Sequence, residues 1–188
     1  SYIISRYSNI RFINGYGPTE NTVCSTSHTY GNDTTQDSNC IGKPLSGVTC
    51  YVLDDDQNLL PDGVVGELYL GGLQLATGYH NRPELNNKSF INNPFVSPSD
   101  LEKGINTRLY ATGDMVCRKA DGLLYFMGRK DFQVKLRGYR IELADIESTI
   151  LSHPEVQQCV VEVRQMGDAI LLVAHIETAN SQLTATCL

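Results

Sequence analysis

Apolar and polar residues alternate in several short segments of the first 140 residues, which is the pattern of half-buried β-strands. In residues 48–53 (VTCYVL), the side chains of Val48, Cys50 and Val52 fall on one face. Further short strands are predicted at residues 9–14, 67–70, 109–112, 123–127 and 132–137. Turns rich in Gly and Asp, such as Pro61-Asp62-Gly63, separate them. Short strands at this spacing predict a distorted β-barrel or a sandwich.

The period of the pattern changes after Arg140. Four apolar residues then fall on one helical face, and Pro154 follows them, so we predict a helix that ends before this proline. These residues are Leu143, Ile146, Ile150 and Leu151. Residues 156–163 (VQQCVVEV) and 169–176 (AILLVAHI) predict two strands joined by a turn. The expected fold class is therefore mixed: a β subdomain followed by the start of a small α+β subdomain.

Charge and cysteine usage narrow the functional classes. The chain of 188 residues has 15 Lys and Arg against 21 Asp and Glu, a formal charge of −6, which argues against a nucleic-acid partner. No apolar run approaches the roughly 20 residues of a membrane span. The six cysteines form no CxxC pair, and the start of the sequence has no secretory pattern. We therefore expect reduced thiols, no zinc site and a cytoplasmic location.

The segment NGYGPTE, residues 14–20, combines groups that suit a nucleotide. Two glycines flank Tyr16 and leave an aromatic face open for stacking, and the amide of Asn14 can contact a base edge. The hydroxyl of Thr19 suits a phosphate oxygen, and the carboxylate of Glu20 suits Mg²⁺. Taken alone, however, the segment favours a simple Gly-Pro turn with a packed tyrosine.

A second segment with acceptor chemistry is YATGD, residues 110–114. Asp114 follows a Thr-Gly turn at the end of a predicted strand, where its carboxylate could accept hydrogen bonds from both hydroxyls of a ribose. The alternative is an aspartate that caps its own turn. By contrast, GELYLGG at residues 66–72 indicates a strand and a turn, and we predict a structural role for it.

The segment from Gly128 to Glu142 places cations, including Arg129 and Lys135, on alternating sides of an extended chain. One interpretation is contact with an anion near a domain boundary. The other is a charged edge strand, where Lys and Arg oppose aggregation. The run alone does not decide between them.

Together and in this order, the motifs resemble the adenylation domains of nonribosomal peptide synthetases (NRPSs), within the adenylate-forming ligase superfamily. The resemblance covers essentially the whole chain. It is carried by NGYGPTE, IGKPLSGVTCYVLD, GELYLGGLQLATGYHNRPELN, RLYATGD and GRKDFQVKLRGYRIELADIE. The wording QVKLRGYRIEL is more similar to amino-acid activators, including D-alanine–carrier-protein ligases, than to acyl-CoA synthetases.

This resemblance implies a nucleotide site for ATP or AMP. Tyr16 would stack on adenine, and Asn14 would contact its exocyclic amine. Asp114 would hold the ribose hydroxyls with the help of Arg129. Phe126 stands where the family frequently has a tyrosine, so a hydroxyl contact to the nucleotide would be lost there.

The resemblance also implies catalytic and substrate-binding residues. Thr19 would contact the α-phosphate, Glu20 would bind Mg²⁺, and Lys135 is a possible partner for substrate or phosphate oxygens. Three residues match positions that line the amino-acid pocket: Gly15, Val23 and Cys24.

Three parts are implied along the chain. Residues 1–30 would end a large N-terminal subdomain and carry the nucleotide loop. Residues 31–130 would form the barrel-like subdomain. Residues 131–188 would begin a mobile C-terminal subdomain, with Asp131 as the hinge, and Gly138 would lie where a pantetheine arm passes.

The implied function is ATP-dependent activation of an amino acid, or another carboxylate, to an acyl-AMP. The acyl group would then pass to the phosphopantetheine thiol of a carrier protein. The sequence shows neither a glycine-rich phosphate loop nor the family's final catalytic lysine, so we expect a fragment that is inactive without the remainder of the domain. The alternatives are a non-catalytic interaction module, or an acyl-CoA or D-alanine–carrier-protein ligase of the same superfamily.

Overall fold

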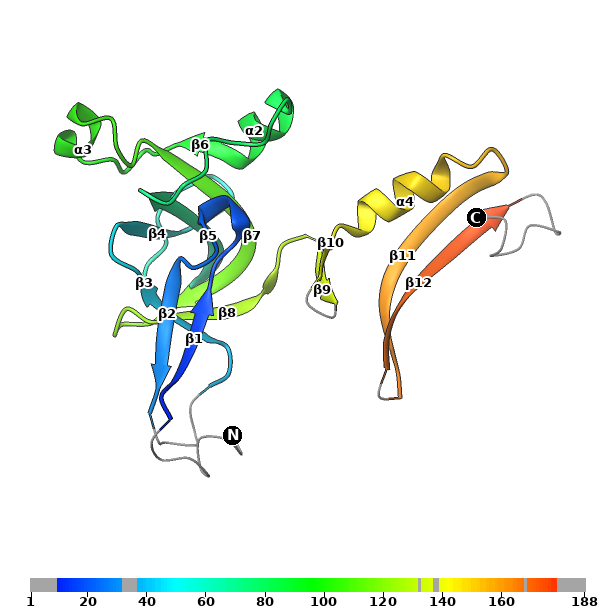
Figure 1. Ribbon diagram of the computed structural model, residues 1–188, viewed down its shortest axis with the longest axis horizontal. Helices are drawn as coiled ribbons and strands as arrows, with labels where there is room; N and C mark the ends of the chain where they lie inside the picture. Colours follow the sequence, from blue (N-terminus) through cyan, green and yellow to red (C-terminus); the bar gives the residue numbers. More distant parts are fainter. Residues whose placement is uncertain (1–9, 32–36, 132, 137–138, 168, 179–188) are drawn as a thin grey trace. The chain divides into compact units, whose positions relative to one another are not determined.

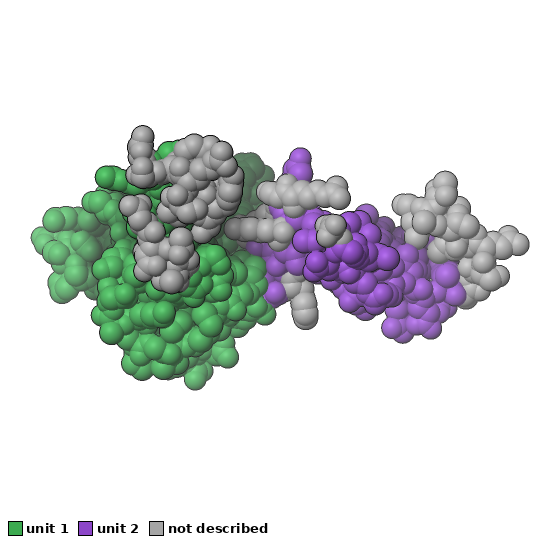
Figure 2. Space-filling model, turned by 90° about the horizontal axis from the view of Figure 1, so that it is seen from below, with its two compact units in different colours: residues 1–130 green, residues 131–188 purple. Residues whose placement is uncertain are grey.

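The structure is a computed structural model that describes residues 10–31, 37–131, 133–136, 139–167 and 169–178. The chain divides into two compact units, Ser1–Lys130 and Asp131–Leu188, which Figure 2 shows in two colours. No helix among the described residues is long and apolar enough to cross a membrane.

The described residues of unit 1 form a sheet of eight strands (Figure 1). They are β1 (Phe12–Tyr16), β2 (Thr26–Tyr30), β3 (Cys40–Pro44), β4 (Val48–Leu53), β5 (Val65–Gly72), β6 (Phe90–Asn92), β7 (Arg108–Arg118) and β8 (Leu124–Arg129). Their order is β1-β2-β3-β8-β7-β5-β4, and β6 pairs with β7. Every pairing between these strands is antiparallel.

The mixed fold class is confirmed, but the sheet does not close into a barrel. Its described strand path begins at β1 and ends at β4, and no described pairing joins these two strands. Residues 12–30 belong to this same sheet, because β2 pairs with β3. The predicted separation of residues 1–30 from residues 31–130 stays a prediction.

The alternation of apolar residues explains the two core clusters of unit 1. On the central strand β5, Leu68 and Leu70 point to one face of the sheet and Tyr69 to the other, since successive residues of a strand alternate. Leu68 and Leu70 pack with Val52 and Val116, among others, and all four are almost fully buried. Each buried leucine contributes about 1.5–3 kcal/mol. These buried leucines therefore anchor strand β5 in the core, and the neighbouring strands pair with it.

The connections of unit 1 contain short helices. A 3₁₀ turn, η1 (Thr19–Asn21), lies in the loop between β1 and β2. Helix α2 (Pro83–Ser89) begins with a proline, and α3 (Pro98–Glu102) follows Ser97, whose hydroxyl accepts a hydrogen bond from the backbone of Asp100. Both helix starts use residues that suit the first turn of a helix.

The described part of unit 2 contains one helix and two small sheets. Strands β9 (Val134–Leu136) and β10 (Tyr139–Ile141) pair with each other, and helix α4 (Leu143–Leu151) follows. Strands β11 (Val156–Met166) and β12 (Ala169–Thr178) form an antiparallel hairpin. The side chain of Glu147 on α4 accepts a hydrogen bond from the backbone of Val161, at 2.8 Å. The predicted helix and the two strands after it are confirmed.

Candidate functional site

Strand β7 carries a bulge at the TGD motif. Glu67 pairs with Met115 and Tyr69 pairs with Ala111, so the single residue Leu68 lies opposite three residues of β7. The middle one, Gly113, has a φ of +71°, a left-handed conformation that glycine adopts without steric cost. Bulges of this kind redirect side chains, and this one sets the position of the next residue, Asp114.

Asp114 is a buried carboxylate on β7 that residues from two other strands hold. Its residue is 8% exposed, and Oδ1 accepts a hydrogen bond from Nη1 of Arg129 on β8 at 2.6 Å. Oδ2 accepts a hydrogen bond from the hydroxyl of Tyr16 on β1. Charge-assisted bonds of this kind offset the cost of burying a carboxylate. The strands thus bring together three residues that the sequence predicted for one site.

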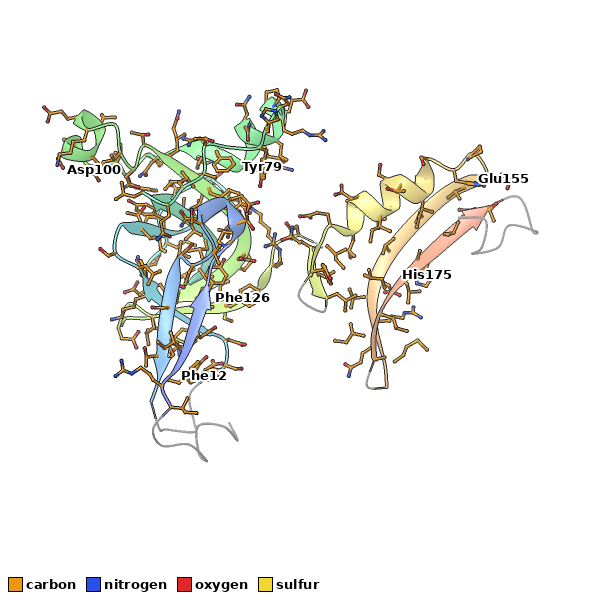
Figure 3. All side chains as sticks on the ribbon, in the orientation of Figure 1. Phe12, Tyr79, Asp100, Phe126, Glu155 and His175 are labelled. Carbon is orange, nitrogen blue, oxygen red and sulfur yellow. The ribbon has the colours of Figure 1, made fainter. Side chains whose placement is uncertain are left out.

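The electrostatics of this cluster keep Tyr16 as a hydrogen-bond donor. Burial, and next the negative charge of Asp114, raise the pKa of the Tyr16 phenol above its usual value. An ionised carboxylate has about four acceptor positions, so the bonds from Tyr16 and Arg129 leave capacity for further donors. The rings of Tyr16 and Phe126 both pack against the core that contains Leu68 (Phe126 is labelled in Figure 3).

The loop between β1 and β2 is closed by a backbone bond from Ser25 to the carbonyl of Tyr16, at 2.7 Å. Gly17 is required in this loop because a Cβ there would lie 2.6 Å from the Ser25 nitrogen. The left-handed φ values of Thr22 and Val23, 51° and 67°, turn the chain back toward β2. This arrangement leaves Thr19 exposed and buries Glu20.

Glu20 lies in a second cluster, which a later loop completes. Its Oε1 accepts a hydrogen bond from the hydroxyl of Tyr79 at 2.6 Å, and its backbone carbonyl accepts one from Ala76 at 2.9 Å. The Tyr79 hydroxyl lies 3.5 Å from that of Tyr110 on β7 (Tyr79 is labelled in Figure 3). Since Tyr110 and Asp114 are on one strand, β7 connects the two clusters.

Two further features concern metal ligands and surface hollows. Among the described residues, no group of three or more His, Cys, Asp or Glu side chains could hold a metal ion. A surface hollow of about 500 Å³ exists on unit 1, but none of the predicted nucleotide residues lines it. Its lining residues are Asp62, Gly63, Lys119, Ala120 and Asp121.

Comparison with known proteins identifies the family to which the sequence is related. Residues 4–80 match the family model for AMP-binding enzymes. The sequence is 49% identical over 183 residues to a linear gramicidin synthase protein of Brevibacillus parabrevis, covering 96% of this chain and 3% of that protein. Malpibaldin synthetase of Mortierella alpina is 45% identical over 177 residues, covering 94% and 3%. The chain belongs to the AMP-binding enzyme family.

Solved structures agree with this assignment and show that the chain corresponds to part of an NRPS adenylation domain. PA1221, an NRPS protein containing adenylation and PCP domains, matches with a TM-score of 0.79 at 30% identity. That match covers 96% of this chain and 35% of PA1221. AB3403, a four-domain NRPS solved with AMP and glycine, matches with a TM-score of 0.57 at 40% identity, over 95% of this chain and 13% of AB3403. The predicted family is confirmed, and the chain spans 35% or less of each of these relatives.

The other residues predicted for this adenylation domain are distributed as follows. Asn14 donates its amide to the carbonyl of Cys40 at 2.8 Å, which fixes its orientation. A Cβ on Gly15 would lie 3.0 Å from the Cys24 sulfur, so these two predicted pocket residues are adjacent. The third, Val23, is 75% exposed.

Three predictions concern unit 2 of the adenylation domain. Asp131 is its first residue, and the side chain of Asp131 accepts a hydrogen bond from the backbone of Gln133 at 3.1 Å. Lys135 lies on β9 opposite Arg140, but its side chain is outside the described part of the chain, as is the whole of Gly138. The roles predicted for these residues stay predictions.

Two polar residues of this adenylation domain were not assigned to the site by the sequence analysis, which predicted a structural role for GELYLGG. Tyr79 holds the Glu20 carboxylate, and Glu67 on β5 accepts a hydrogen bond from the backbone of Gly113 at 3.1 Å. Tyr79 lies in a loop after a Thr-Gly pair, where no periodicity of the sequence predicts a contact with Glu20. Glu67 did carry a signal, because it is a carboxylate at the start of an apolar strand, ELYL.

Proposed function

We propose that the chain supplies the adenosine-binding part of an adenylation domain that activates an amino acid with ATP. The observation that supports this most strongly is the buried Asp114 carboxylate, held between the Tyr16 hydroxyl and the Arg129 guanidinium. These two donors orient both oxygens, and the remaining acceptor positions suit the paired hydroxyls of a ribose. The ring of Tyr16, on strand β1, supplies the stacking surface for adenine.

In the proposed reaction, a carboxylate oxygen of the amino acid attacks the α-phosphorus of ATP, and pyrophosphate leaves. The thiol of a phosphopantetheine arm then attacks the acyl carbon, and AMP leaves. The residues of this chain orient the nucleotide during both steps: Asp114 fixes the ribose, and the exposed Thr19 donates to the α-phosphate. A carrier protein as acceptor is supported by the adenylation–PCP proteins among the structural neighbours.

We propose Glu20 as the protein ligand of Mg²⁺. Magnesium in nucleotide enzymes is usually bound by one or two carboxylates together with phosphate oxygens, so a single buried carboxylate suits an ion that arrives with ATP. The hydrogen bond from Tyr79 fixes one oxygen of Glu20 and is compatible with metal binding, because a carboxylate accepts several partners. When bound, the ion would neutralise charge on the phosphates.

The affinity of this chain for AMP should be low. One base–aromatic stack contributes roughly 1–3 kcal/mol, and the bonds to a charged carboxylate about 1.5–3 kcal/mol. About 4 kcal/mol corresponds to a millimolar dissociation constant, so we expect a value near millimolar or weaker. The chain spans 35% of PA1221, and we expect no ATP–pyrophosphate exchange from it alone.

The test is a titration of the 188-residue chain with AMP, followed by the NMR signals of backbone amides. We expect shifts at Tyr16, Asp114 and Arg129 that saturate in the millimolar range and are lost in Asp114→Asn. The matched control is Asp56→Asn, because Asp56 is exposed and lies in a turn after β4. Shifts that leave these three residues unchanged, or that persist in Asp114→Asn, would overturn the proposal and favour an interaction module.

A further inference from the structure

Glu67 is a buried carboxylate in the central strand of unit 1. It is 7% exposed, and it precedes Leu68, Tyr69 and Leu70, which are core residues. A carboxylate in such a place loses its hydration and is destabilising unless charged or polar partners replace the water. Its partners therefore indicate why an acidic residue occupies this position.

Both oxygens of Glu67 have partners, and the partners are connected to each other. Oε1 accepts a hydrogen bond from the backbone nitrogen of Gly113, and Oε2 accepts one from Nζ of Lys130, each at 3.1 Å. The backbone nitrogen of Lys130 donates to the carbonyl of Gly113 at 2.8 Å. Glu67, Gly113 and Lys130 thus form a closed ring of hydrogen bonds, which we call the Glu67 clamp.

The clamp replaces strand pairing that the bulge removes. Gly113 lies within the three residues opposite Leu68, where the regular ladder between β5 and β7 is interrupted. Its N–H is satisfied by Glu67 and its carbonyl by Lys130. The flanking groups are also satisfied, because Arg129 donates to the Thr112 carbonyl at 3.1 Å and the Thr112 hydroxyl accepts from the Asp114 nitrogen at 3.0 Å. Buried backbone groups require such partners.

The clamp also holds the end of unit 1. Lys130 is its last residue, and it is attached through its backbone to Gly113 and through its side chain to Glu67. A second ion pair joins Lys130 to Asp55 at 2.7 Å, but the Asp55 side chain is 89% exposed, so solvent screens this pair. The buried partner Glu67 is therefore the one that fixes Lys130.

We propose that Glu67 is a positioning residue for the ribose site, acting through Gly113 on Asp114, and that Lys130 holds Glu67 in this position. The inference rests on the proposed function, because it assumes that Asp114 receives the ribose. Glu67 itself does not contact the nucleotide. It fixes the bulge, and the bulge fixes the angle at which the carboxylate meets the two hydroxyls.

Ribose discrimination separates positioning from a merely structural role. The dissociation constants of AMP and 2′-deoxy-AMP are compared by NMR titration of the 188-residue chain. A role limited to stability would lower the midpoint of unfolding but leave the ratio of the two constants unchanged in the folded fraction. The preference for AMP is the dissociation constant of 2′-deoxy-AMP divided by that of AMP. We expect this ratio to fall about tenfold in Glu67→Gln, since small displacements of binding groups have effects of this size. The backbone amide signal of Asp114 should shift as well.

Two other variants keep the test decisive. Lys130→Met changes a half-exposed residue, should fold, and should reduce the ratio by about threefold, because the hydrogen bond from the Gly113 N–H to Glu67 remains. Asp62→Asn is the control, because it removes a carboxylate from a surface ion pair with Arg118 on the same strand β7. Its ratio should equal that of the unmodified chain.

The outcomes distinguish the two proposals. If Asp114→Asn keeps the preference for AMP over 2′-deoxy-AMP, the proposed ribose site is wrong. If Asp114→Asn loses the preference while folded Glu67→Gln and Lys130→Met keep it, the ribose site stands and the positioning role of Glu67 is wrong. A loss in all three variants, with Asp62→Asn unchanged, supports both.

Discussion

Asp114 and Glu20, the two acidic residues that we assign to the nucleotide, are both buried but are held in different ways. Asp114 lies on a strand inside the sheet, and its partners Tyr16 and Arg129 lie on strands β1 and β8. Glu20 lies in a loop, and a second loop holds it through Tyr79 and Ala76. Register between strands fixes the first carboxylate, whereas contacts between two loops fix the second. We expect the first cluster to tolerate substitution less.

The largest effect is expected from Arg129→Met. This change leaves the buried Asp114 carboxylate without its guanidinium partner, and breaking a buried pair in this way typically costs about 3–5 kcal/mol. The free energy of unfolding, from urea titration of the 188-residue chain, measures the loss. The control is Arg118→Met, which breaks a partly exposed pair and should cost at most about 1 kcal/mol. Equal losses in the two variants would refute the contrast between the buried pair and the surface pair.

A smaller effect is expected from Tyr16→Phe. The substitution keeps the ring but removes the hydrogen bond to Asp114, at a cost of about 2 kcal/mol. Because the stacking surface remains, AMP should still bind, but with a weaker preference over 2′-deoxy-AMP. Urea unfolding and the NMR titration report the two effects separately. Unchanged stability would show that the Tyr16 hydroxyl does not hold Asp114.

Burial of a thiol in the core of unit 1 should make the stability of the protein sensitive to alkaline pH. Burial raises the pKa of the Cys50 thiol from its ordinary value of 9.0 to about 12, and Cys50 packs against the same core cluster as Tyr16. The folded state therefore holds this proton more tightly than the unfolded state. The contribution to stability is complete below pH 9 and is lost at about 1.4 kcal/mol per pH unit as the pH rises toward 12.

Urea unfolding at pH 8, 9 and 10 tests this dependence. Stability should be nearly constant up to pH 9 and should fall between pH 9 and 10. Cys50→Ala should make that fall shallower, and Cys24→Ala is the control that should not. A slope that is identical in all three proteins would remove Cys50 as the cause.

The smallest effect is expected from Tyr79→Phe. It removes the donor to Glu20, but the Tyr110 hydroxyl lies 3.5 Å from that of Tyr79, and the loops can adjust toward it. We therefore expect a loss of about 1 kcal/mol, below that of Tyr16→Phe. If Tyr79→Phe proved the more destabilising of the two, the contrast between strand-held and loop-held carboxylates would be wrong.

The sequence predicted the elements of this protein better than their contacts. Strand β4 and helix α4 follow from the alternation in residues 48–53 and from the helical face that begins at Leu143. Asp114 and Arg129 were selected from their motifs, and the structure brings them together with Tyr16. Local patterns were sufficient for the strand and the helix, whereas the common site of the three polar residues was predicted from the resemblance to a family.

The Glu67 clamp could not be predicted, because it depends on a bulge. Alternation places Glu67 on the same side of β5 as Tyr69, and only the interrupted register brings Gly113 to its carboxylate. The link from Glu20 to Tyr79 spans 59 residues between two loops, and no periodicity connects them. The open sheet was missed for a similar reason, since short strands at close spacing do not specify whether the first and the last meet.

The left-handed backbone of Val23 has a consequence for anyone who wishes to redesign substrate choice. A β-branched residue at a φ of 67° is unusual, and its side chain is 75% exposed. At this predicted pocket position, asparagine or glycine would suit the backbone better than the natural residue. Libraries that vary specificity could therefore include these two residues at position 23 without a loss of folded protein.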